Sequence, residues 1–175
     1  MVTASNNAKT GKVKLTWDAV EGAVAYKIYR ATEKDGAYKL MYTTSNTSYN
    51  NTSAKAGEKY YYKVVAVAEK SAANSAASAV VARVCDLAQP KVTGKVTLVG
   101  NPKLTWEKVD GAVSYKVYRA ESANGDYKLM KTVTGTSYTN TSHVNGKTYF
   151  YKVVAVCENT SGNSAASNVV KLTAK

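Results

Sequence analysis

Residue types that carry most enzyme chemistry are scarce in this chain of 175 residues. It contains one histidine, His143, and two cysteines, Cys85 and Cys157, which stand far apart in the sequence. A zinc site takes several His, Cys or acidic ligands, and a Ser-His-Asp triad needs a histidine between its two partners. The sequence therefore excludes both kinds of site, and we expect no metal ion and no other cofactor. His143 is expected to be an exposed loop residue.

Acidic residues are also few, at 12 against 24 lysines and arginines. Most of them flank expected turns, as Asp18, Glu21 and Asp110 do. A glycosidase needs two carboxylates that face each other across a cleft, and a calcium site needs a cluster of oxygen ligands. Neither pattern is present, so we expect that the chain is not an enzyme.

The net charge of +12 favours anionic partners, such as an acidic protein, an anionic glycan or a cell-wall polymer. The lysines are spread along the chain, however, and form no basic cluster interleaved with aromatic residues. Nucleic-acid binding is therefore not expected. The alternative is that the lysines only keep the surface solvated.

Long apolar runs are absent, and none approaches the roughly 18 residues that a membrane-spanning helix needs. Residues 1–6 lack the basic and then apolar order of a signal peptide. The chain is then either cytosolic or a piece of a longer protein. We expect the second, a monomeric part of a secreted or cell-surface protein to which Met1 was added as a start codon.

What the chain does have is an internal repeat. The segments Lys14–Trp17, Tyr38–Met41 and Tyr62–Val67 recur 89 residues later without a gap. Between Lys14 and Ala82, about six in ten of the aligned positions are identical. This period is the size of one β-sandwich domain and too long for a solenoid unit. We therefore expect two copies of one folded unit, with loops of equal length.

The pattern within each repeat indicates strands. Val13, Leu15 and Trp17 alternate with polar residues, and the aromatic residues are 14 Tyr against 1 Phe and 2 Trp. Tyrosine suits strands that have one buried and one wet face. The strands expected in the first repeat are residues 2–3, 12–17, 24–30, 38–44, 47–49, 59–68 and 74–84. About seven strands a repeat predict an all-β fold of two tandem sandwiches, with domains at 1–88 and 89–175.

These strands also carry a familiar set of landmarks. A Trp on the second strand precedes Gly-Ala-x-x-Tyr-x-(Ile/Val)-Tyr-Arg and then Gly-x-x-Tyr-x-Tyr-x-Val-x-Ala-Val, in both repeats. The chain thereby resembles fibronectin type III repeats, which are immunoglobulin-like sandwiches, and is most similar to those in large surface proteins of Gram-positive bacteria. The resemblance implies core positions for Trp17 and Trp106, and tyrosine corners at Tyr60 and Tyr149, where a buried ring sends its hydroxyl to nearby backbone.

Alternation along the strands also predicts an outward face that mixes tyrosine and lysine. It could stack on sugars or bind an acidic protein, or it could serve only as cross-strand pairing that supports the sheet. The residues expected on it are Lys27, Tyr29, Tyr61, Lys63, Lys116, Tyr118, Phe150 and Lys152.

The two cysteines are placed differently in the repeat. Cys85 ends the first copy, and Cys157 follows the sixth strand of the second. In this topology the two positions lie toward the junction of the domains, so an interdomain disulfide is one hypothesis. The other is two thiols, with Cys157 buried as a small apolar residue.

Two functions are consistent with these features. The first is a non-catalytic structural or interaction module, a spacer or adhesive segment of a larger bacterial surface or secreted protein. The alternative is an accessory pair of domains that recognises a glycan or a host protein, attached to a glycan-degrading enzyme. The fold alone cannot name a ligand.

Overall fold

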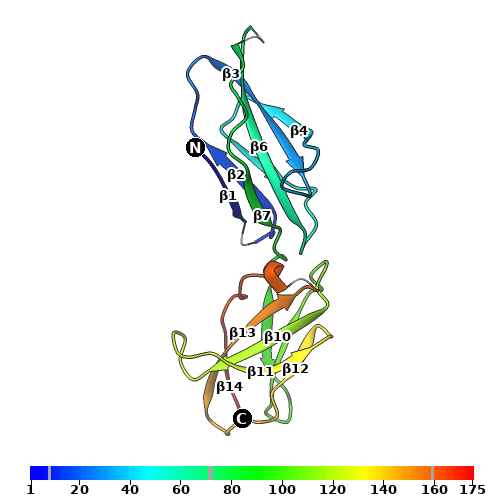
Figure 1. The fold of residues 1–175 in the computed structure, drawn as a ribbon. Helices are drawn as coiled ribbons and strands as arrows, with labels where there is room; N and C mark the ends of the chain where they lie inside the picture. The colour runs from blue at the N-terminus through cyan, green and yellow to red at the C-terminus, as the bar shows by residue number, and fades with distance from the viewer. Residues whose placement is uncertain (8, 71–72, 159) are drawn as a thin grey trace.

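The computed structural model of the chain describes residues 1–7, 9–70, 73–158 and 160–175. Two sandwiches stand end to end, which we call the first and the second module (Figure 1). The strands of the first module are β1 (Val2–Asn6), β2 (Val13–Trp17), β3 (Ala23–Ala31), β4 (Lys39–Thr44), β5 (Ser48–Asn51), β6 (Lys59–Ala68) and β7 (Val81–Val84). The second module has β8 (Val92–Val96), β9 (Pro102–Trp106), β10 (Ser114–Ala120), β11 (Lys128–Val133), β12 (Ser137–Thr139), β13 (Thr148–Val156), the short 3-10 helix η2 (Thr160–Gly162) and β14 (Val170–Thr173).

Each module packs a three-stranded sheet against a four-stranded one. The sheets of the first module have the orders β1-β2-β5 and β4-β3-β6-β7, and those of the second have β12-β9-β8 and β11-β10-β13-β14. Neighbouring strands in these sheets pair antiparallel. The prediction of two tandem seven-stranded sandwiches is confirmed.

Alternating side chains of the paired sheets form the core of each module. On β2, Val13, Leu15 and Trp17 are buried, as the period of two requires. Trp17 meets the ring of Tyr26 edge-on, with their centroids 5.5 Å apart. The second module repeats this contact, since the Trp106 and Tyr115 centroids lie 5.3 Å apart.

The hydroxyl of each of these buried tyrosines holds a loop or a side chain, which a phenylalanine could not do. In the first module, the hydroxyls of Tyr26, Tyr60 and Tyr62 accept from Val20 N at 2.9 Å, Lys55 N at 3.1 Å and Asn51 Nδ2 at 2.8 Å. In the second, Tyr115, Tyr149 and Tyr151 accept from Val109 N at 2.8 Å, Val144 N at 3.0 Å and Asn140 Nδ2 at 2.8 Å. The bonds of Tyr60 and Tyr149 are tyrosine corners. Burial raises the pKa of Tyr62 to about 12, although its bond from Asn51 acts in the opposite direction.

The last strand of each module is shorter than the sequence predicts. We expected a strand over residues 74–84, but only Val81–Val84 are in β7. Before it, Ser75 and Ser78 donate their amides to Ala66 O and Val64 O, and their hydroxyls accept from the amides of the same two residues. Because serines three residues apart serve positions two apart on β6, this segment follows β6 without a regular ladder.

The two modules are also not identical in loop length. Val2 pairs with Trp17, whereas Val92 pairs with Trp106, so the first strands are offset by 90 residues and the rest by 89. The hairpin after β1 therefore has one residue more than the hairpin after β8. The equal spacing of the repeats, which the sequence shows from Lys14 onward, does not extend to this hairpin.

Candidate functional site at the junction of the modules

From Leu87 onward, the segment between β7 and β8 buries side chains in the core of the second module. Leu87 is 1% exposed and belongs to the core of the second module, and Ala88 packs against that core. Ala56 of the first module packs against the same core. The cores thus separate between Asp86 and Leu87, two residues before the predicted boundary.

Consecutive amides of this segment donate to different modules. Asp86 N donates to Gly11 O of the first module at 3.1 Å, and Leu87 N donates to Gly162 O of the second at 2.7 Å. Gly11 has a φ of +69°, and a Cβ there would lie 2.0 Å from Asp86 O. Because the two anchored amides are consecutive, no unanchored residue lies between them.

Gly162, at the end of η2, lies against the backbone of the first module. A Cβ on Gly162 would lie 2.8 Å from Gly57 Cα and 2.9 Å from Cys85 O, which are distances that real Cβ atoms do not tolerate. Gly57 N in turn donates to Cys85 O at 2.7 Å, which ties this surface of the first module together. Figure 1 shows η2 lying between the two sandwiches.

The two cysteines lie on opposite sides of this junction and are both thiols, so the interdomain disulfide is not formed. Cys85 is packed in the core of the first module and Cys157 in the core of the second. Each side chain points into its own sandwich, which is what the sequence pattern could not show. Burial raises the pKa of the Cys85 thiol.

The predicted tyrosine and lysine face lies on the outer side of the four-stranded sheets. Tyr29 is opposite Lys63 across β3 and β6, and Tyr118 is opposite Lys152 across β10 and β13. All eight predicted residues are half-buried rather than fully exposed. Four of them lie in each module, so each module carries its own part of this face.

Two tyrosines that sequence reasoning missed cover the central lysines of this face. Lys63 Nζ lies 4.1 Å from the centre of the Tyr38 ring, and Lys152 Nζ lies 4.0 Å from that of Tyr127. These are cation–π contacts within each module. Their recurrence at Tyr38 and Tyr127, which the repeat relates, is the signal that could have found them. Lys63 and Lys152 are thus already paired inside the protein.

His143 is half-buried and not exposed as predicted. Its Nε2 lies 2.7 Å from Asn101 Oδ1, and its Nδ1 is buried without a hydrogen-bond partner. The first module has Lys12 and Ala54 at these positions, where Lys12 Nζ donates to Ala54 O at 2.6 Å. Within the described residues, no three His, Cys, Asp or Glu side chains gather as metal ligands would.

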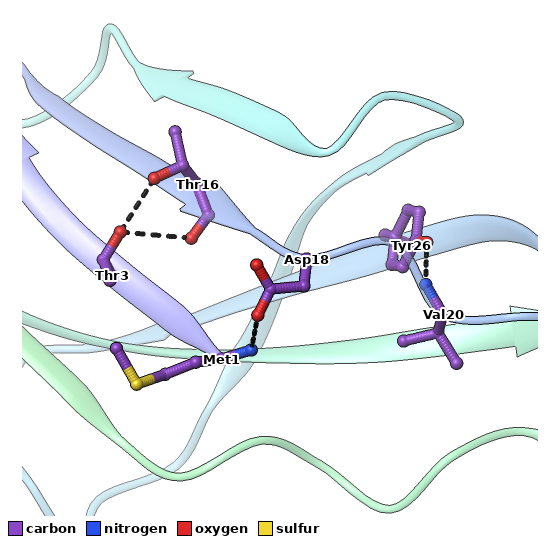
Figure 2. A network of polar contacts seen from close by, with 6 residues as sticks. All are labelled: Met1, Thr3, Thr16, Asp18, Val20 and Tyr26. Carbon is purple, nitrogen blue, oxygen red and sulfur yellow. Dashed lines mark hydrogen bonds and ion pairs between the residues drawn. The ribbon is translucent and has the colours of Figure 1, made fainter.

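The opposite pole of the first module carries an open apolar groove beside Trp17. Near it the N-terminal amine contacts the carboxylate of Asp18, and Val20 N donates to the hydroxyl of Tyr26 (Figure 2). Thr3 Oγ1 and Thr16 Oγ1 lie 2.7 Å apart across β1 and β2. No helix in the described ranges is both long and apolar enough to cross a membrane.

Comparison with curated proteins finds segments of larger enzymes. A stretch of 83 residues, 46% of this chain, is 42% identical to part of an amylopullulanase from Thermoanaerobacter thermohydrosulfuricus. A stretch of 77 residues, 42% of this chain, is 40% identical to part of an amylopullulanase from Thermoanaerobacterium saccharolyticum. The matched part is 6% of each enzyme. No family model matches the chain.

Solved structures resemble the chain over both modules. A segment of two fibronectin type III domains from chicken tenascin superposes with a TM-score of 0.59 at 18% identity, covering 99% of this chain and 97% of that one. The chicken interferon gamma receptor alpha chain gives 0.65 at 15% identity, covering 98% and 96%. At these identities the likeness shows the fold, which is a tandem pair of fibronectin type III-like sandwiches.

Proposed function

We propose that this chain is a non-catalytic spacer in a larger secreted or cell-surface protein, and that it holds the parts on either side at a fixed separation. The junction is the observation that carries the proposal. Leu87 is buried in the second core, the preceding amide is anchored to the first module, and Gly162 contacts backbone of the first module. A linker in which consecutive residues are anchored to both modules holds the two modules at a fixed relative position.

The similarity to parts of amylopullulanases supports a place beside a glycan-degrading enzyme. In that setting the modules would separate a catalytic unit from another part of its chain. Whole-enzyme activity would belong to that other unit. The partners of the spacer would then be its own neighbours in the polypeptide.

Spin-label distance measurements test the rigidity that the proposal requires. Labels would be attached at Thr43→Cys and Thr132→Cys, which are exposed and equivalent positions of the two modules. The background would carry Cys85→Ala and Cys157→Ala, since each module already has alanine where the other has cysteine, at Ala174 and Ala68. We expect one narrow distance distribution.

A loosened variant supplies the matched control. Three glycines inserted between Asp86 and Leu87 break the anchored pair of amides, and they should broaden the distribution. A distribution equally broad with and without the insertion would contradict the spacer proposal.

The alternative is that the outer tyrosine and lysine face binds an α-glucan or an anionic partner. The positions of Tyr29 and Tyr118 on that face favour it, while the pairing of Lys63 and Lys152 with rings of the same module favours a structural role. Calorimetric titration with pullulan and with poly-glutamate distinguishes the two. A heat of binding to either polymer that disappears in Tyr29→Ala or Tyr118→Ala would establish the alternative. We expect to measure no heat of binding.

A further inference from the structure

The groove at the outer pole of the first module has a volume of about 320 Å³ and a mostly apolar lining. Trp17, Val20, Tyr26, Ala66 and Ala79 are among the residues that form it. Val20 is 47% exposed, which is unusual for a valine bordering a core. The groove lies between the two sheets, next to the start of β1.

At the equivalent pole of the second module, the segment that precedes β8 covers the residue that corresponds to Val20. Val109, the equivalent of Val20, is only 7% exposed. Leu87 and Pro90 are both buried there, and Leu87 Cδ2 lies 3.2 Å from the place of a Cβ on Gly111, in the loop that follows Val109. This segment leads directly into β8.

Strand register identifies the corresponding segment of the first module. Val92 pairs with Trp106 as Val2 pairs with Trp17, so Lys91 is the equivalent of Met1. Leu87 and Pro90 therefore correspond to positions on the N-terminal side of Met1. The groove beside Val20 lacks what Leu87 and Pro90 provide on the second module.

We propose that this groove binds an extended Leu-x-x-Pro segment of another module of the same fold, running into β1 as Leu87–Pro90 run into β8. The proposal deepens the spacer function and rests on it, because it makes the pair part of a longer row. Burial of the leucine and of Val20 would supply the driving force. The junction already present in the chain is the template for the contact.

Two differences between the modules would make the proposed contact looser than the junction within the chain. Ala73 stands where the second module has Gly162. Its methyl group would meet the backbone of the preceding module, just as a Cβ on Gly162 would meet Gly57. Ala79 stands where Asn168 binds both backbone groups of Val92, at 3.0 Å and 2.9 Å. The segment can therefore dock while its module stays farther away.

The test extends the full chain by this segment. The sequence Asp-Leu-Ala-Gln-Pro is fused to the N-terminal side of Met1, and a matched chain carries Asp-Ser-Ala-Gln-Pro. We expect nuclear Overhauser contacts between the methyl groups of the added leucine and those of Val20 and Ala66. We also expect amide exchange of Tyr26 and Val64 to slow by about fivefold or more relative to the serine chain.

Val20→Asp in the leucine chain checks that the groove is the site. Val20 is half exposed, so the substitution should leave the module folded while abolishing the contacts and the slower exchange. Absence of contacts in the leucine chain, or contacts that persist in Val20→Asp, would overturn the proposal. A narrow spin-label distribution in the same chain would then still support the spacer, so the two failures are distinguishable.

Discussion

Gly162 of the second module lies so close to Gly57 of the first that a methyl group on Gly162 would come within 2.8 Å of the Gly57 Cα. The φ of Gly162 is not in the left-handed region, so the glycine is needed for this approach and not for its own backbone conformation. One missing side chain thus sets how near two sandwiches can stand.

The first prediction is that Gly162→Ala loosens the junction without unfolding either module. The added methyl group meets backbone and not a flexible side chain, so the modules must move apart. Spin labels at positions 43 and 132 should give a broader or shifted distance distribution. Gly135→Ala is the control, because nothing lies within 4 Å of its Cβ position, and it should leave the distribution unchanged.

The second prediction concerns the anchor of the linker. Leu87→Ala should lower the free energy of unfolding of the second module by about 2–5 kcal/mol, as for other fully buried leucines. The first module should keep its stability, because Leu87 is not in its core. Residue-resolved amide exchange in urea separates the two effects. Leu129→Ala, at 51% exposure in the same module, should cost little, and an equal cost would refute the assignment.

The third prediction compares two equivalent tyrosines. Tyr115→Phe leaves the buried amide of Val109 without an acceptor and should cost about 1–3 kcal/mol of unfolding free energy. Tyr26→Phe frees the amide of Val20, which water can reach, and should cost less than about 1 kcal/mol. Chemical denaturation of the two variants measures the difference. Equal losses would show that the linker between the modules does not shield the bond between Val109 N and the Tyr115 hydroxyl from water.

The fourth prediction is a loss of stability at alkaline pH. Because the pKa of Tyr62 is raised to about 12 by burial, the folded state holds the phenolic proton more tightly than the unfolded state does. The contribution of Tyr62 is complete below about pH 10 and should fall by about 2 kcal/mol as the pH rises to about 12.

Urea unfolding across that pH range, followed together with phenolate absorbance, measures this fall. Tyr62→Phe should flatten the decline, although it lowers stability at neutral pH by leaving Asn51 Nδ2 without its acceptor. A slope that does not change in Tyr62→Phe would assign the decline to other groups.

Much of the fold follows from alternation along the chain. Val13, Leu15 and Trp17 point inward as predicted, and Tyr60 and Tyr149 form the bonds that the resemblance to fibronectin type III repeats implies. These features depend on residues near in sequence or on a strongly repeated pattern. A period of two and a repeat are both visible without coordinates.

The junction could not be derived in the same way. In the aligned repeats, Gly162 in place of Ala73 looks like one more difference between loops. Only the packed modules show that the missing methyl group permits a close approach to the backbone of the first module. The disulfide hypothesis failed for a similar reason, since strand position does not say that Cys85 and Cys157 turn into separate cores. The shortened last strand was hidden because serine hydroxyls replaced backbone groups as acceptors.

Those serines have a consequence for how many such modules can share one polypeptide. Ser75 and Ser78, like Ser164 and Ser167, engage their own neighbouring strand while leaving the outer edge of the sheet irregular. A regular, open edge would be a template on which a strand of a nearly identical neighbour could add. By making that edge a poor template, the serines protect closely related units in one chain from exchanging strands as they fold.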